Sequence, residues 1–195
     1  MTTPSEPHEA FSAPTPQTAS EPLAAESSLG VSEETRALYE DFYQAQAERD
    51  PVWRALGAHE KVSSLEQLCS SIAHKSVLEI GAGDGSLSAL LEQREFFEAL
   101  SALDISPSGI ERLNARGLER LKEARVFDGA RVPHPDKSFD LAVLSHVVEH
   151  LEHPRQLLYE AKRVARHVFV EVPIEDTRAL SQRYVPDHVG HINVY

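Results

Sequence analysis

A short glycine-rich segment near the middle of the chain constrains the fold more than any other feature. The apolar run Val77–Ile80 stops at three glycines spaced two apart, Gly81, Gly83 and Gly85, and a leucine-rich helical pattern begins at Ser86. This pattern predicts a buried strand of a parallel sheet, then a tight turn and a helix. Glycine is needed where the backbone turns sharply and a ligand approaches main-chain atoms. We therefore expect a nucleotide-like ligand at the carboxyl end of this strand.

Strands and helices alternate along the rest of the chain. The pattern predicts strands at 77–80, 98–104, 124–127, 139–144 and 167–172, and helices at 86–92, 107–115 and 154–166. Alternation of this kind is typical of an α/β fold with a doubly wound, mostly parallel sheet and right-handed crossovers. The segment between Asp128 and Phe139 is too rich in proline for a crossover helix, so we expect a loop there.

Two helices are expected before the first strand. Ser32 can cap a helix that runs to about Arg49, where Asp50-Pro51 would end it. The second covers about 60–73 and leads into the first strand. On the first helix Tyr39 falls on an aromatic face with Tyr43, which we expect to pack against the sheet; the alternative is that Tyr39, Tyr43 and Trp53 cover the ligand pocket.

The first 30 residues differ in composition from the rest. They hold five prolines, four glutamates and no lysine or arginine, and they lack sustained apolar periodicity. This composition is typical of a disordered acidic tail. We therefore expect a tail at 1–30, a helical cap at 31–75 and a nucleotide-binding α/β domain at 76–195.

Charge and cysteine content limit the partners and the compartment. The net charge is −12, which disfavours nucleic acid and anionic lipid as partners. Cys69 is the single cysteine, so no intrachain disulfide forms; its apolar neighbours favour a packed thiol. No secretion signal and no apolar run of membrane-spanning length is present, so we expect a cytoplasmic protein without membrane contact.

The glycine spacing separates two nucleotide families. The dinucleotide fingerprint G-x-G-x-x-G has glycine at its sixth position, where this chain has Ser86. Here the spacing is G-x-G-x-G, and Glu79 precedes the first glycine by two residues. This version resembles motif I of the class I S-adenosylmethionine-dependent methyltransferases.

Three further segments resemble the same family, and the resemblance covers 77–173. The second predicted strand ends at Asp104, the third is followed by Asp128-Gly129, and the fourth runs into Ser145 and His146 before a short helix. The resemblance implies the Rossmann-like methyltransferase fold with strand order 3-2-1-4-5. The family sheet has two more strands, which the 22 residues after Pro173 do not provide; we expect the chain to lack them and to be C-terminally incomplete.

The resemblance also implies a set of binding residues. S-adenosyl-L-methionine would be held by Gly81, Ala82, Gly83 and Gly85 at its methionine part with Glu79 orienting it, by Asp104 and Ile105 at the ribose, by Asp128 and Gly129 at the adenine, and by Ser145 near the methyl group. An alternative is that Asp104 caps the following helix, which Ser106-Pro107 could open, and that Asp128 only forms a turn.

His146 is the candidate catalytic residue, as the base or as a group that orients the substrate. The segment from His146 to His150 also matches H-x-x-E-H, a zinc-protease signature. A strand running up to Ser145 and the early Pro154 leave no room for the uninterrupted ligand helix that such a site needs, so we expect no metal. Glu149 and His150 are expected to hold the short helix in place. His188 and His191, near Tyr184, are further candidates for substrate contact.

The sequence therefore predicts a methyltransferase acting on a small molecule, with the acceptor atom and the oligomeric state open. Two alternatives stay open. One is a non-catalytic methyltransferase-like partner subunit, which the missing strands would suit. The other is a nicotinamide-dependent oxidoreductase, which would need the sixth-position glycine and a hydride-transfer site.

Overall fold

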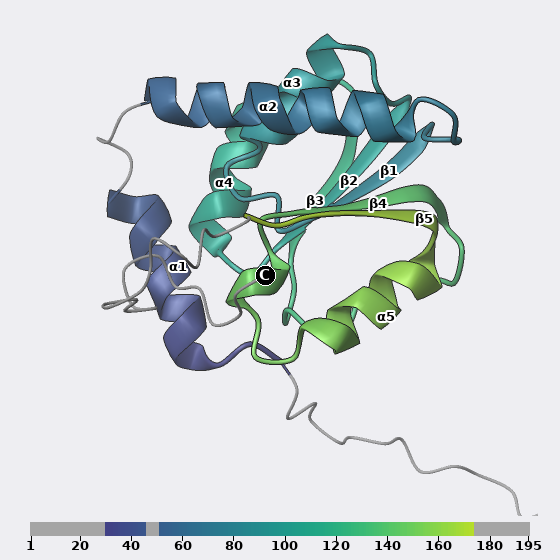
Figure 1. Ribbon diagram of the computed structural model, residues 1–195. Coiled ribbons are helices and arrows are strands. Elements are labelled where there is room, and N and C mark those ends of the chain that lie inside the picture. Colours follow the sequence, from purple (N-terminus) through teal and green to yellow (C-terminus); the bar gives the residue numbers. More distant parts are fainter. Residues whose placement is uncertain (1–29, 46–50, 174–195) are drawn as a thin grey trace, which may run out of the picture.

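A five-stranded parallel sheet forms the centre of the protein. The computed structural model describes residues 30–45 and 51–173 (Figure 1). The strand order is β3-β2-β1-β4-β5, and every neighbouring pair is parallel. The strands are β1 (Ser76–Ile80), β2 (Ala99–Asp104), β3 (Leu121–Val126), β4 (Phe139–Ser145) and β5 (Ala165–Glu171). The doubly wound sheet and its predicted order are confirmed; the expected absence of two last strands concerns 174–195, which lie outside the described residues.

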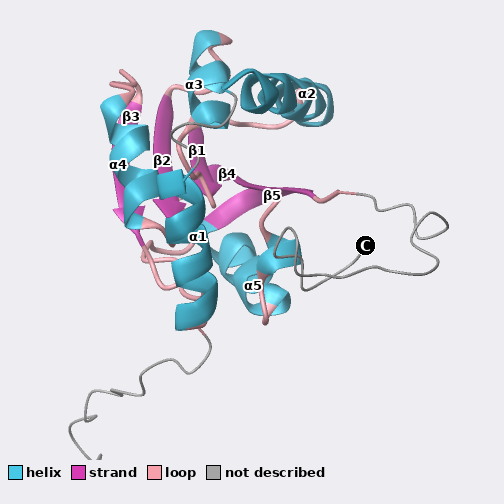
Figure 2. Ribbon diagram, turned by 90° about the vertical axis from the view of Figure 1, so that its left-hand side faces the viewer, coloured by secondary structure: helices cyan, strands magenta, loops and turns pink. Residues whose placement is uncertain are grey.

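Helices cover both faces of this sheet. Figure 1 shows α2 (Pro51–Cys69) and α3 (Ser86–Gln93) above the strands and α5 (Pro154–Val164) below them. Helix α4 (Pro107–Ala115) covers the same face of the sheet as α3. Helix α1 (Glu33–Ala45) lies near the carboxyl ends of the strands (Figure 2). None of the helices that the structure describes is long and apolar enough to cross a bilayer.

Burial on both faces explains the continuous apolar runs of the inner strands. In β4, Leu141 and Val143 pack with α2 and α3, whereas Ala142 and Leu144 pack with α5, and none of the four is exposed. The outer strands β3 and β5 are partly exposed along their length. The central residues of β1, β2 and β4 are buried on both faces of the sheet, so these strands show no alternation of polar and apolar residues.

The largest differences from the helix boundaries expected from the sequence concern α2 and α5. Helix α2 begins at Pro51, nine residues earlier than predicted, because proline is well suited to the first turn of a helix, where its missing N–H is not needed. The same Asp50-Pro51 was expected only to end the preceding helix. Helix α5 ends at Val164, and β5 begins directly at Ala165, which is already in extended conformation.

The Gly85 position tests how tightly the turn after β1 is packed. Gly85 has φ 74°, and a Cβ there would lie 2.8 Å from Leu113 on α4. Gly117 has a similar φ of 65° with open space around it, so Gly117→Ala serves as a control for backbone strain alone. We expect Gly117→Ala to cost about 1–2 kcal/mol of unfolding free energy. Gly85→Ala should cost clearly more in urea titrations; equal losses would contradict the packing.

Candidate functional site

The turn after β1 forms the floor of the site. Gly81, Gly83 and Gly85 all have positive φ, of 79°, 54° and 74°. The N–H groups of Gly81 and Ala82 donate to the carbonyl oxygen of Leu103, at 2.7 and 3.1 Å. A Cβ at Gly81 would collide with Val147 at the end of β4. The three predicted glycines are thus required by backbone conformation, and Gly81 and Gly85 also by close contact.

Asp104 joins this turn to the next loop. It is the last residue of β2 and only 4% exposed; its Oδ2 accepts from Gly83 N at 2.7 Å and its Oδ1 from Ser106 N at 2.8 Å. Burial raises the pKa of Asp104, although these N–H donors and the charge of Arg36 act against the rise. The cap of α4 is Ser106, whose hydroxyl accepts from Gly109 N at 3.1 Å. Asp104 is therefore not the cap of this helix.

Glu79 lies inside the sheet behind the glycine turn. It is 4% exposed, and Ser88 at the start of α3 donates a short hydrogen bond to its Oε2. Burial raises the pKa of Glu79 to about 7, while the Ser88 hydroxyl and the charge of Lys61 act against the rise. It does not line the pocket described below. Its proposed role in orienting a methionine group stays a prediction.

The loop after β3 contacts the N-terminal segment. Oδ1 of Asp128 accepts from the N–H groups of Ala130 and Arg131, both at 2.8 Å, and so closes a turn. The Asp128 carbonyl accepts from Val31 N at 3.0 Å. Gly129 has φ 83°, and a Cβ there would collide with Val31. The expected contact between Asp128 and an adenine stays a prediction.

The segment after β4 brings two histidines to a buried carboxylate. His146 has φ 56°, a conformation that costs a non-glycine residue about 1–3 kcal/mol. Its N–H donates to the carbonyl of Glu171 at 2.9 Å, and Ser145 donates to the Glu171 carboxylate at 2.6 Å. Glu149 is not exposed at all; its Oε1 lies 3.3 Å from Nδ1 of His146 and 3.8 Å from Nε2 of His150.

The ionisation of Glu149 depends on these neighbours. Burial alone would raise its pKa, but the hydrogen bond from His146, its own backbone N–H and the charge of His150 outweigh burial and lower the pKa below its ordinary value. Glu149 therefore stays a carboxylate in the interior. The short helix expected here is a single 3₁₀ turn, Val148–His150. Among residues 30–45 and 51–173, no cluster of three or more metal-ligating side chains is present.

Helix α1 forms the side of the site next to the loop after β2. The sequence indicates this contribution only weakly. Arg36 donates to the carbonyl of Ile105 at 2.8 Å, and Glu40 accepts from the Ser106 hydroxyl at 2.6 Å. Tyr39 packs edge-on against His150, with ring centroids 5.4 Å apart. Burial, then the charges of Glu149 and Asp104, raises the pKa of Tyr39. The expectation that Tyr39 packs against the sheet gives way to the alternative: it lines the pocket.

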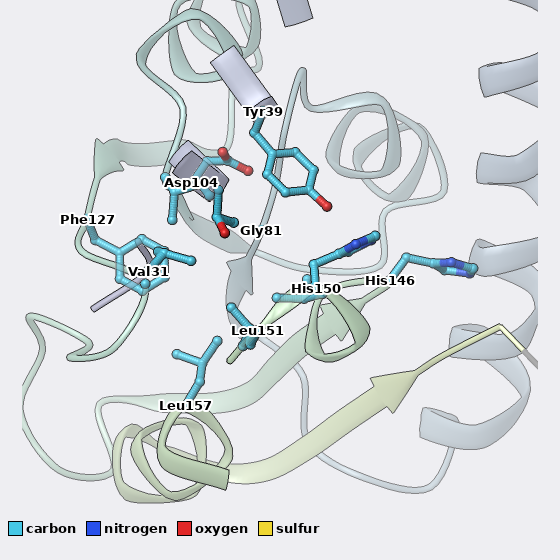
Figure 3. A pocket seen from close by; sticks show the side chains of 13 residues that line it. Val31, Tyr39, Gly81, Asp104, Phe127, His146, His150, Leu151 and Leu157 are labelled. Carbon is cyan, nitrogen blue, oxygen red and sulfur yellow. The ribbon is translucent and has the colours of Figure 1, made fainter. Parts of the chain in front are cut away.

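These elements enclose a pocket with about 490 Å³ of empty space, part of it open to solvent. Its lining residues are Val31, Thr35, Tyr39, Gly81, Asp104, Ile105, Phe127, Gly129, His146, Val147, His150, Leu151 and Leu157. Figure 3 shows Phe127 and Val31 at one end and the two histidines at the other, with Asp104 and Gly81 between them. The ring of His146 points outward, away from Leu151 and Leu157.

Five of the predicted site residues line this pocket, namely Gly81, Asp104, Ile105, Gly129 and His146. The other six do not line it, namely Glu79, Ala82, Gly83, Gly85, Asp128 and Ser145. His188, His191 and Tyr184 lie outside the described residues, and the side chains of Tyr43 and Trp53 are not described either. Sequence reasoning did not single out Val31, Thr35, Leu151 and Leu157, because an apolar wall carries no motif.

Comparison with known proteins supports the resemblance found in the sequence. Residues 78–168 match a family model described as a methyltransferase domain. The predicted resemblance to S-adenosylmethionine-dependent methyltransferases is thus confirmed for this part of the chain.

Curated relatives and solved structures agree with this methyltransferase family. Phosphatidylethanolamine N-methyltransferase of Cereibacter sphaeroides is 32% identical over 94 residues, 46% of this chain and 45% of the relative. Malonyl-[acyl-carrier protein] O-methyltransferase of Paenibacillus sp. is 34% identical over 95 residues, 46% of this chain and 34% of the relative. The chain thus spans less than half the length of both. The structure of a DhpI-SAM-HEP complex has the same fold, with TM-score 0.58, 21% identity and coverage of 79% of this chain and 72% of that one.

The buried Glu79 of the methyltransferase domain predicts a pH dependence of stability. Its folded pKa of about 7 lies above the ordinary value of 4.5, so the folded state binds the proton more tightly. This tighter binding contributes about 3 kcal/mol to the unfolding free energy. The contribution is complete below pH 4.5 and is lost as the pH rises through about 7.

Glu79→Gln removes this titration and serves as the reference. We expect the unfolding free energy of the wild type to fall relative to Glu79→Gln across this window in urea titrations. Parallel curves for the two proteins would contradict the raised pKa of Glu79.

Proposed function

We propose that this protein binds S-adenosyl-L-methionine and transfers its methyl group to a small-molecule acceptor. The observation that carries the proposal is a buried carboxylate, Asp104, at the end of β2 in the wall of a pocket whose floor is Gly81. The sequence resemblance implies that both residues would contact the cofactor. Proteins of this fold bind nucleotides at the carboxyl ends of the strands.

The pocket suits the adenosine part of the cofactor. Apolar side chains at the Phe127 end, with Val31 and Ile105 among them, offer a slot for a purine ring. Asp104 lies next to this slot. A carboxylate has about four lone-pair sites, so Asp104 can accept from ribose hydroxyls while it keeps its two backbone donors.

The methionine part would lie along the glycine turn toward His146. Of the three buried carboxylates Asp104, Glu79 and Glu149, Asp104 lines the pocket and the other two do not. Negative groups favour a ligand that carries a sulfonium charge. When bound, S-adenosyl-L-methionine supplies an electrophilic methyl group with a good leaving group. The protein therefore has mainly to orient the acceptor and, where needed, to remove its proton.

A small-molecule acceptor is supported by composition and by the relatives. The net charge of −12 disfavours nucleic acid as a partner. The relatives named above are described as an N- and an O-methyltransferase, so nitrogen and oxygen acceptors are both candidates. The single, buried Cys69 suits a reducing compartment, and we place the protein in the cytoplasm.

Replacement of Asp104 tests the choice of cofactor. Asp104→Ala removes hydrogen bonds to a charged group, worth about 1.5–3 kcal/mol. We expect affinity for S-adenosylhomocysteine to fall about 10- to 150-fold in isothermal titration. Asp136→Ala, which removes an exposed carboxylate paired with Arg163, should bind like the wild type.

The nicotinamide alternative is tested in the same titrations. Unchanged affinity for S-adenosylhomocysteine in a folded Asp104→Ala protein would contradict the proposed contact of Asp104 with the ribose hydroxyls. Tight binding of NAD with no binding of S-adenosylhomocysteine would favour an oxidoreductase. Binding of neither compound would favour a non-catalytic partner subunit.

His146→Ala tests the role of this histidine in turnover. If His146 removes a proton or orients the acceptor, the rate should fall by about 10² or more. Cofactor affinity should barely change, and neither zinc nor a chelator should affect either protein. The measurement is methyl transfer from radiolabelled S-adenosyl-L-methionine to a panel of amines, alcohols and phenols. Parallel loss of cofactor binding and stability would mean that His146 is structural, and a chelator-sensitive rate would indicate a metal.

A further inference from the structure

A buried carboxylate that contacts a histidine at the pocket end calls for an explanation. Glu149 has no exposed surface, and a buried charge is costly unless paired. It directs Oε1 to Nδ1 of His146 at 3.3 Å, whereas Nε2 of His150 is farther away at 3.8 Å. The side chain of His146 is 37% exposed, while that of His150 is 16% exposed. Of the two histidines, His146 is both closer to the carboxylate and more open to an incoming molecule.

The backbone also holds His146 in a defined position. Its φ of 56° is unusual for a residue with a side chain, and the residue keeps this conformation because its N–H donates to the Glu171 carbonyl at 2.9 Å. The glycine turn adds a second restraint, since Val147 packs directly on Gly81. His146 is thus held at the main chain by β5, and its Nδ1 lies 3.3 Å from Oε1 of Glu149, close enough for a short adjustment of the ring to complete a hydrogen bond. Its other ring nitrogen, Nε2, lies on the opposite side of the imidazole.

We propose that Glu149 is a positioning residue that keeps the proton of neutral His146 on Nδ1 and leaves Nε2 as the base for the methyl acceptor. An imidazole that donates from one nitrogen to a carboxylate accepts with the other. A carboxylate in this position also stabilises the imidazolium that forms when Nε2 takes up a proton. The role of Nε2 toward a methyl acceptor rests on the proposed function. The tautomer of His146 does not depend on it.

The proton balance defines the class of acceptor. An acceptor X–H forms its new bond to the methyl carbon, the carbon–sulfur bond breaks with its electrons on sulfur, and the proton of X–H passes to Nε2 of His146. No oxidant or reductant is needed. The pair His146–Glu149 therefore suits an acceptor that must lose a proton, such as a hydroxyl, phenol or protonated amine, and gives no advantage to a tertiary amine.

The tautomer of His146 can be measured without a known acceptor. Long-range ¹H–¹⁵N spectra of the full chain with ¹⁵N-labelled histidine distinguish Nδ1–H from Nε2–H, at a pH where histidines are neutral. His146→Gln identifies the signals of this residue. In the wild type we expect the Nδ1–H form to predominate. A predominant Nε2–H form, which is the preferred tautomer in water, would overturn the proposal.

Two variants test whether Glu149 is the cause. Glu149→Met removes the acceptor and keeps an unbranched side chain, so His146 should change to the Nε2–H form. His150→Gln is the matched control, because it alters the other neighbour of Glu149, and His146 should keep Nδ1–H. Retention of Nδ1–H in a folded Glu149→Met protein would overturn the proposal; if this variant does not fold, the wild-type tautomer decides.

Titration with S-adenosylhomocysteine separates the two proposals. If S-adenosylhomocysteine does not bind but His146 has the Nδ1–H form, the proposed cofactor is wrong and the proposed role of Glu149 stands. If S-adenosylhomocysteine binds but His146 has the Nε2–H form, the proposed role of Glu149 is wrong and the proposed cofactor stands.

Discussion

The turn after β1 is tied to the end of β2 by three hydrogen bonds, and the rest of the site is arranged around them. The N–H groups of Gly81 and Ala82 donate to the Leu103 carbonyl, and that of Gly83 donates to Asp104. Only a chain that reaches positive φ at these glycines can make this turn. The turn fixes the Asp104 carboxylate beside the Gly81 backbone. The pocket then has its acidic group and its open main chain in one place.

Helix α1 depends on the same strand ends. Arg36 and Glu40 attach it to the loop after β2, and Val31 attaches the preceding residues to the loop after β3. These contacts place Tyr39 in the pocket wall beside Asp104 and His150 (Figure 3). A ligand beside Tyr39 would be shielded from water on that side. Shielding of this kind strengthens the interaction of buried carboxylates with a cationic ligand.

Sequence reasoning predicted the parts of the site that rest on local chemistry. Glycines at 81, 83 and 85 were predicted because a sharp backbone turn imposes this residue type, whereas Asp104 was predicted through the resemblance to the methyltransferases. The contribution of α1 could not be predicted, since contacts such as that of Arg36 with a carbonyl 69 residues away leave no local pattern. The complete burial of Glu149 was missed for a similar reason: a polar segment after a strand is usually exposed.

Hydrogen exchange with and without S-adenosylhomocysteine tests most directly whether the cofactor occupies this pocket under α1. The account predicts that amides of 81–85, of 104–106 and of 127–130 exchange more slowly with ligand, and that α1 gains protection with them. Helix α2, none of whose residues lines the pocket, should change little. Saturating ligand with no added protection at the glycine turn and α1, or with protection confined to α2, would contradict the account.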